Sequence, residues 1–594
     1  MDVLGLICGL ALFLFGMDLM GNALKRSAGK KLKRILGELT SNKLKGFLLG
    51  LGVTAIIQSS SATTVMVVGF VNSGTMLLSQ AVGVIMGANV GTAVTAWITA
   101  LNGISGGSGA LTFLNYLKPD FWMPLLAIFG VILIMASKKQ RTKDIATILL
   151  GFAVLMVGMT LMSDAVSSLK DNESFTRILT VFSNPILGVL AGTLLTVIVQ
   201  SSSASIGILQ ALSTTGAISF SMAIPIILGQ NIGTCVTAMI SSLGANKNGK
   251  RAAFVHLYFN VFGVIIWLSL YYLIAWLLGV CGVFDALGAA EAASINMWGI
   301  AIVHTVFKVL NVITFAPFTK FLEKLACLTV RGDDKVGDEY TNMLDERLLD
   351  TPTVAIERSR AVAAKMASLT AGALKDSVSL LDTYDKKTAE KVREAEERSD
   401  IYEDALASYL VKLSSRSMDE ADSREVTMLL HMVSDLERIG DHAVNIVEAA
   451  EEMQDGDVRF SEAAKEQLSY LYRAVCEIVS ITERAFCDGD VETALLVEPL
   501  EQVVDDLRDE IRRRHVSRLQ KSECTLEHGF LLSEILTNLE RVADHCSNIA
   551  GCLIEMTAHD SLDIHGYLRR VRASAPEFKK SYASFSEKYS LPRE

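Results

Sequence analysis

The stretch Gln58-Ser59-Ser60-Ser61-Ala62 returns later in the chain as Gln200-Ser201-Ser202-Ser203-Ala204. A second motif, Gly87-Ala88-Asn89-Val90-Gly91-Thr92, returns as Gly229-Gln230-Asn231-Ile232-Gly233-Thr234. Both motifs lie at the same distance along the chain from their copies, so the two copies align without a gap. Duplicated membrane units are typical of secondary transporters. The pattern therefore predicts two related halves of a membrane unit, at about residues 5–100 and 147–242.

Hydropathy and charge divide the 594 residues into two unlike parts. Half of the chain is apolar, and the mean hydropathy of +0.37 is too high for an ordinary soluble protein. Residues 1–320 carry 20 basic and 10 acidic residues, whereas the rest of the chain carries 35 basic and 55 acidic residues. We therefore predict an all-α chain with a membrane domain over 1–320 and a linker over 321–350. We also predict an acidic soluble domain over 351–558, followed by a C-terminal helix or tail over 559–594.

The charges of the loops predict the topology of the membrane domain. A span needs about 20 apolar residues, and stretches of that length occur near 3–24, 46–70, 76–100, 121–137, 146–165, 184–212, 217–243, 253–281 and 296–319. Basic clusters within 25–45, 138–143 and 247–251 mark cytoplasmic loops. The loops at 101–120, 164–180 and 282–295 are then external. The two copies cross in opposite senses, as inverted repeats do, and we expect a multi-pass protein of the plasma (inner) membrane with a cytoplasmic C-terminal domain.

The repeated tetrads are the candidate binding site. Gly46, Gly50, Gly52 and the serines would weaken a plain spanning helix, so a re-entrant hairpin fits residues 46–100 better than a second span. The free N–H groups of a broken helix favour an oxyanion. Its carbonyls, with Ser, Thr, Gln and Asn oxygens, suit a hard cation such as sodium. The alternative is that small polar residues only hold helices together. The candidate ligands are Gln58, Ser59, Ser60, Ser61, Asn89, Thr92, Gln200, Ser201, Ser202, Ser203, Asn231 and Thr234.

Ionisable residues are rare inside apolar segments, and three of those in this chain are candidates for a function. Asp18 is either a solvated residue near the interface or a coupling residue. His304 and Lys308 are four residues apart, so they share one helix face. They either attract the anion or pack against a helix end.

Paired Gln-Ser-Ser-Ser motifs in inverted repeats resemble the type II sodium–phosphate cotransporter family over about residues 1–320. The resemblance implies paired re-entrant hairpins, sodium-coupled transport of inorganic phosphate, and tetrads that bind phosphate and sodium near the midplane. The second copy departs after its tetrad, where Ser205-Ile206 replaces Thr63-Thr64. This difference leaves the number and placement of the sodium sites open.

The soluble part is predicted to form six long helices in two bundles, and it is also duplicated. Leu436 to His442 matches Leu539 to His545, and each copy holds two E-x-x-x-D pairs. Spacing of four residues places both carboxylates on one helix face, and two such helices side by side could bind Fe, Mn, Mg or Zn. The alternative is a solvated acidic face. The candidate metal ligands are Glu396, Asp400, Glu437, Asp441, Glu501, Asp505, Glu540 and Asp544.

These motifs resemble the PhoU domain over about residues 350–555. The resemblance implies a cytoplasmic regulatory role and a multinuclear metal cluster with Glu437, Asp441, Glu540 and Asp544 among its ligands. We therefore expect a sodium–phosphate cotransporter with a regulatory tail, acting in uptake or in export. A phosphate sensor that signals to another protein and a carrier of another oxyanion are the alternatives. We expect neither an enzyme nor a nucleic-acid-binding protein, and the oligomeric state stays open.

Overall fold

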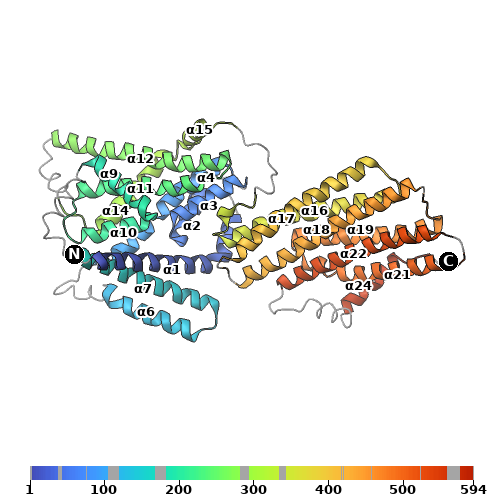
Figure 1. The fold of residues 1–594 in the computed structure, drawn as a ribbon. Helices are drawn as coiled ribbons and strands as arrows, with labels where there is room; N and C mark the ends of the chain where they lie inside the picture. The colour runs from blue at the N-terminus through green and yellow to red at the C-terminus, as the bar shows by residue number, and fades with distance from the viewer. Residues whose placement is uncertain are drawn as a thin grey trace. The chain divides into compact units, whose positions relative to one another are not determined.

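The computed structural model describes thirteen stretches of the chain. They are residues 3–37, 43–74, 76–104, 119–167, 182, 184–280, 293–332, 343–416, 418, 420–456, 458–521, 524–557 and 576–592. Most of each loop predicted to be external falls outside these stretches. The chain forms two compact units, Met1–Leu348 and Leu349–Glu594, which are coloured along the sequence in Figure 1. The described residues form helices and a single isolated bridge between Ser219 and Ser294, which confirms the all-α prediction.

The first unit contains both predicted repeats as matching sets of helices (Figure 1). The first set is α1 (Val3–Gly37), α2 (Lys43–Ile57), α3 (Ser60–Asn72), α4 (Leu78–Gly91) and α5 (Ala93–Ala100). The second set is α7 (Gln140–Ser167), α9 (Pro185–Val199), α10 (Ser202–Ser213) and α11 (Phe220–Ser241). Four further helices are α6 (Pro119–Ala136), α12 (Lys247–Val280), α14 (Met297–Phe315) and α15 (Thr319–Thr329).

Helix length distinguishes the spanning segments from the predicted hairpins. Six apolar helices among the described residues are long enough to cross a membrane. The apolar stretches 46–70 and 184–212 are each divided in two, because α2 ends before the first tetrad and α9 before the second. Each of the four resulting helices is shorter than a span, as a re-entrant hairpin requires.

Glycines allow the helices of each repeat to approach closely. A Cβ atom on Gly50 of α2 would lie 2.0 Å from the carbonyl oxygen of Val84 on α4, and one on Gly192 of α9 would lie 2.0 Å from that of Ile226 on α11. Gly50 and Gly192 occupy equivalent positions in the two repeats, so both repeats use the same contact. The sequence suggested that Gly50 weakens its helix. In the structure Gly50 lies within α2 and allows this helix to pack closely against α4.

The equivalent helices α1 and α7 pack against each other in opposite directions. Gly9 lies against Met162, Gly16 against Leu155, and Gly151 against Met20. An antiparallel pair of equivalent helices is what inverted repeats produce around a pseudo-two-fold axis.

The second unit contains the six predicted long helices. They are α16 (Pro352–Leu380), α17 (Lys386–Ser414), α18 (Glu420–Asp455), α19 (Glu462–Asp488), α21 (Val497–Gln520) and α22 (Leu526–Thr557). The short α20 (Val491–Ala494) precedes α21, and α24 (Pro576–Lys588) packs on α21. His442 of α18 and His545 of α22, which match in the sequence repeat, stack with their ring centroids 5.6 Å apart.

Two described parts of the predicted linker, residues 321–332 and 343–348, belong to the first unit. The linker contains most of α15, and its last residues are docked on the first unit. Asn72 donates a hydrogen bond to Asp345 at 2.7 Å, and Arg347 Nε donates to the carbonyl of Ser241 at 2.8 Å. The linker end is thereby fixed to the ends of both α3 and α11, one from each repeat.

Candidate functional site

Each tetrad forms the turn that starts a helix, with the same geometry in both repeats. Gln58 and Gln200 have positive φ angles of 61° and 54°, which a non-glycine residue adopts at a cost in free energy. Ser59 then caps α3 by accepting a hydrogen bond from the Ala62 N–H at 3.2 Å, and Ser201 caps α10 in the same way. Strained turns persist where the surrounding structure imposes them, and they cluster at functional sites.

A pair of hydroxyl groups braces each turn. Thr54 Oγ1 donates to Thr63 Oγ1 at 3.0 Å, and Thr196 Oγ1 donates to Ser205 Oγ at 3.0 Å. The difference between Thr63 and Ser205 therefore preserves the hydroxyl and its contact. The sequence difference that remains is Thr64 against Ile206, both buried.

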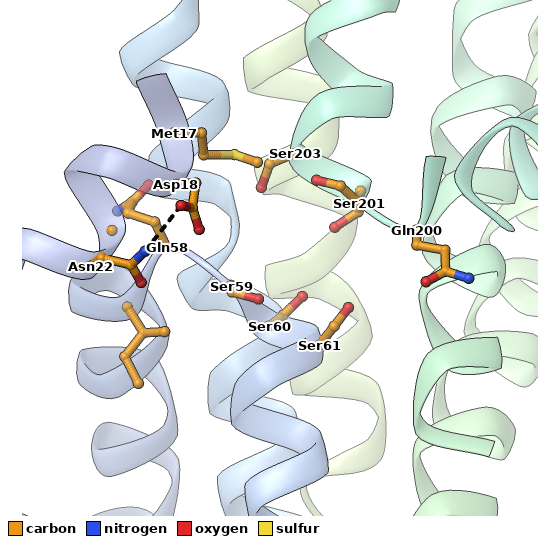
Figure 2. Close-up of a pocket in the computed structure, with 13 residues that line it drawn as sticks. Met17, Asp18, Asn22, Gln58, Ser59, Ser60, Ser61, Gln200, Ser201 and Ser203 are labelled. Atoms are coloured by element: carbon orange, nitrogen blue, oxygen red, sulfur yellow. Dashed lines mark hydrogen bonds between the residues drawn. The ribbon is translucent and has the colours of Figure 1, made fainter. Parts of the chain in front are cut away.

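The two tetrads, far apart in the chain, line one cavity of about 220 Å³. Figure 2 shows Ser59, Ser60 and Ser61 on one side and Ser201 and Ser203 on the other. The helix N-termini of α3 and α10 meet at this cavity, so their backbone N–H groups favour an anion there. Its polar lining and its position between the repeats suit a small oxyanion with a coupled cation.

Helix α1 adds residues to the cavity that the motif alone does not predict. Met17, Asp18, Gly21 and Asn22 line it, and Asn22 Nδ2 donates to Asp18 Oδ2 at 3.0 Å (Figure 2). Asp18 places a carboxylate on the wall of the cavity, and carboxylate oxygens suit a hard cation. The signal in the sequence was a carboxylate inside an apolar segment.

The two glutamines of the tetrads are not equivalent. Gln58 is buried, and its Oε1 accepts a hydrogen bond from Thr95 of α5 at 2.8 Å. Gln200 is exposed, and its side chain extends away from the serines in Figure 2. The cavity is therefore asymmetric, and Gln58 connects it to α5.

The second repeated motif does not line this cavity. Asn89 Nδ2 donates to Asn260 of α12 at 2.8 Å, and Thr92 donates to the carbonyl of Ala88. Asn231 and Thr234 bond to backbone carbonyls of their own helix. The structure brings the eight tetrad residues together and places these four in the buried interior nearby, so their part in ion binding stays a prediction.

In the second unit, the first acidic cluster brings carboxylates within coordinating distance of one another. One carboxylate oxygen of each of Glu396, Asp400 and Asp441 lies within 4.8 Å of the other two. Burial, with the negative charge of Asp441, raises the pKa of the neighbouring Glu437 to about 7. The oxygen ligands and the accumulated negative charge fit a hard or borderline metal ion.

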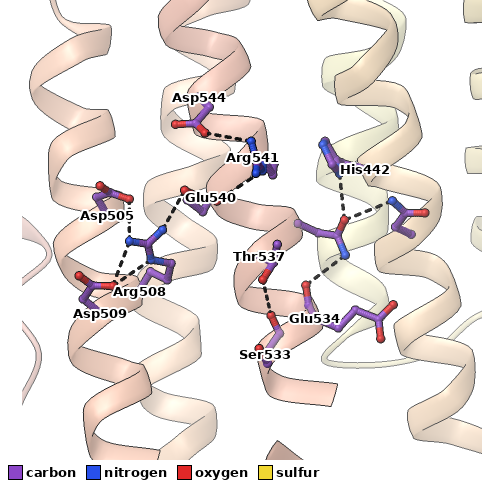
Figure 3. A network of polar contacts seen from close by, with 12 residues as sticks. His442, Asp505, Arg508, Asp509, Ser533, Glu534, Thr537, Glu540, Arg541 and Asp544 are labelled. Carbon is purple, nitrogen blue, oxygen red and sulfur yellow. Dashed lines mark hydrogen bonds and ion pairs between the residues drawn. The ribbon is translucent and has the colours of Figure 1, made fainter. Parts of the chain in front are cut away.

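The second acidic cluster contains its own cation (Figure 3). Arg508 lies 2.8 Å from Glu540 and 3.3 Å from Asp505, and Arg541 lies 4.0 Å from Asp544. When Asp400 is aligned with Asp505, the residue that matches Arg508 in the first copy is Glu403. The two predicted metal sites therefore differ at this position, because Arg508 pairs with carboxylates of the second site where the first has Glu403.

Known families match both units. The Na+/Pi-cotransporter family matches residues 12–164 and 154–292, and the PhoU domain matches residues 363–450 and 468–553. YjbB of Escherichia coli strain K12, a protein named for export of inorganic phosphate, is 25% identical over 565 residues, which cover 94% of this chain and 99% of YjbB.

Two further relatives each match one part of the chain. Sodium-dependent phosphate transport protein 2A of Ovis aries is 24% identical over 378 residues, or 43% of this chain and 59% of that protein. The PhoU homolog 1 of Thermotoga maritima is 28% identical over 186 residues, or 31% of this chain and 79% of that protein. The chain is a membrane protein of the Na+/Pi-cotransporter family that carries a PhoU domain after its membrane unit.

Proposed function

We propose that this protein transports inorganic phosphate by alternating access, with sodium as the coupling ion and the paired tetrads as the binding site. The observation that carries the proposal is the single cavity lined by both tetrads. Two helix N-termini from inverted repeats supply donors for the anion, and Asp18 with the serine oxygens supplies ligands for a cation. The repeats supply the two related states that alternating access needs.

Uptake and export are both consistent with this site, because the gradients set the direction of a reversible carrier. The name of YjbB favours export, and that of the Ovis aries protein favours sodium-dependent transport. A phosphate sensor remains a second candidate, supported by the PhoU domain. A sensor would bind phosphate without rapid flux.

The test is radiolabelled phosphate flux in proteoliposomes, with and without a sodium gradient. We expect sodium-driven accumulation, and we expect Ser60→Ala and Ser202→Ala to abolish it. Ser213→Ala is the matched control, because Ser213 ends the helix that Ser202 begins and both are 5% exposed. Binding without flux would identify a sensor. If Ser60→Ala and Ser202→Ala transported phosphate as fast as wild type, the tetrads would not form the binding site.

We also propose that the cytoplasmic PhoU domain regulates transport and binds Fe, Mn, Mg or Zn at the first acidic cluster. Elemental analysis of the purified protein should find metal that is lost in Glu437→Ala/Asp441→Ala. Metal retained at the wild-type level in this variant would place it elsewhere.

A further inference from the structure

Lys308 of α14 is a buried basic residue inside the membrane unit. Its side chain is 3% exposed, and its Nζ donates a hydrogen bond to the backbone carbonyl of Asn89 at 2.7 Å. Among the described residues, no carboxylate forms an ion pair with it. An ammonium group inside a membrane domain is costly and is usually retained for a function.

The carbonyl that holds Lys308 lies at an interruption in a helix. Helices α4 and α5 form one apolar span, Leu78–Gly103, but the regular hydrogen bonding is interrupted at Thr92. The Thr92 carbonyl accepts from the N–H of Thr95, three residues on, at 3.2 Å, although Thr92 itself keeps helical dihedral angles. Carbonyls in the last turn before such a break lose their regular intrahelical donors. The ammonium group of Lys308 therefore takes the place of a backbone donor at Asn89.

The break is linked to the transport cavity through two residues. Thr95 lies in the first turn of α5, and its hydroxyl donates to Gln58 Oε1 at 2.8 Å. Gln58 belongs to the tetrad and lines the cavity. A change at the break can therefore reach the binding site through one helical turn and one hydrogen bond.

The second repeat satisfies the equivalent carbonyl without a cation. Helix α11 runs without a break through Asn231, the residue that matches Asn89. The Asn231 carbonyl accepts from Thr234 Oγ1 at 2.6 Å and from Cys235 Sγ at 3.6 Å. The two repeats thus differ at one position of the same motif. In the first repeat a lysine ammonium group donates to the carbonyl, and in the second repeat neutral side chains donate to it.

In transporters with inverted repeats, carbonyls at unwound helices coordinate the coupling cations. We propose that the Lys308 ammonium group is a built-in cation that occupies the place of one exchangeable sodium ion at the break between α4 and α5. This inference rests on the proposed sodium-coupled transport. Lys308 then supplies a permanent positive charge, which the transport cycle would otherwise take up from solution as a sodium ion.

The inference makes different predictions for different substitutions. Lys308→Met removes the charge but keeps the bulk of the side chain, so it should lower phosphate flux about tenfold or more at every sodium concentration. Lys308→Ala removes the bulk as well and exposes the Asn89 carbonyl. Its flux should recover at high sodium, with a sodium Hill coefficient about one higher than that of wild type. Lys308→Arg should keep most of the flux, and the exposed Lys320→Met is the control.

A binding measurement accompanies the flux assay, because a variant could fold yet fail to transport. Sodium chloride, compared with choline chloride, should raise the melting temperature of purified Lys308→Ala by more than that of wild type or Lys320→Met. Wild-type-like flux in Lys308→Met would overturn the inference, as would a Lys308→Ala protein that gains no sodium response in either assay. A wild type without phosphate flux would instead defeat the proposed function.

Discussion

A single methyl group at Gly50 should separate two helices that position the first tetrad. The Cβ atom of Gly50→Ala would lie 2.0 Å from the carbonyl oxygen of Val84, whereas ordinary contact begins at 3.4 Å. Helices α2 and α4 would therefore have to move apart until these two atoms reach ordinary contact. The obstructing atom belongs to the backbone, so no side-chain rotation relieves the clash. Overpacking of this kind costs about 1–3 kcal/mol.

Gly52→Ala is the matched control on the same helix. No atom outside its helix lies within 4 Å of the Cβ position of Gly52. Alanine in place of glycine in a helix gains up to about 1 kcal/mol. We expect Gly52→Ala to melt at or above the wild-type temperature and to retain flux.

The assay combines thermal unfolding in detergent with phosphate flux in proteoliposomes. Gly50→Ala should melt below wild type and lose most of its flux, because α2 leads directly into the Gln58 turn. Gly192→Ala should behave in the same way, since its Cβ would lie 2.0 Å from the Ile226 carbonyl. If Gly50→Ala melted and transported like Gly52→Ala, the close approach of α2 and α4 would not position the tetrad.

Three further predictions concern the linker and the PhoU domain. Arg347→Ala removes the hydrogen bonds to Ser241 and Asp345, so limited proteolysis should cleave the linker faster than in wild type or in the exposed control Arg331→Ala. Arg508→Gln should increase the metal that elemental analysis finds, because it removes the ion pairs of Arg508 with Glu540 and Asp505; an unchanged metal content would mean that the guanidinium of Arg508 does not block the second cluster. In metal-free protein, burial with the charge of Asp441 raises the pKa of Glu437 from 4.5 to about 7. The folded state therefore favours the protonated carboxyl, and the stability that this contributes is present below pH 4.5 and is lost as the pH rises through about 7. Glu437→Gln should remove that part of the pH dependence in thermal melts, and an unaltered pH profile would contradict it.

The sequence alone determined the features that depend on local composition and on repetition. Hydropathy separated the two units, the constant offset between the paired motifs identified the repeats, and the tetrads marked the breaks before α3 and α10. Hydropathy and turns depend on which residues can be buried in lipid and which turns a helix tolerates, so neighbouring residues reveal them. The E-x-x-x-D spacing located the acidic helix faces for the same reason. The repeats appear when distant parts of the sequence are compared with each other.

Only the tertiary structure decided which of these features meet. It brought the two tetrads into one cavity, left Asn89, Thr92, Asn231 and Thr234 outside its wall, and added Asp18 and Asn22 from α1. It also placed Arg508 in one acidic cluster and Lys308 on the Asn89 carbonyl. Residues 89 and 308 are far apart in the chain, and no local pattern encodes their contact. Such contacts arise from the packing of whole helices, because the folded chain must satisfy a buried charge with whatever groups that packing brings near.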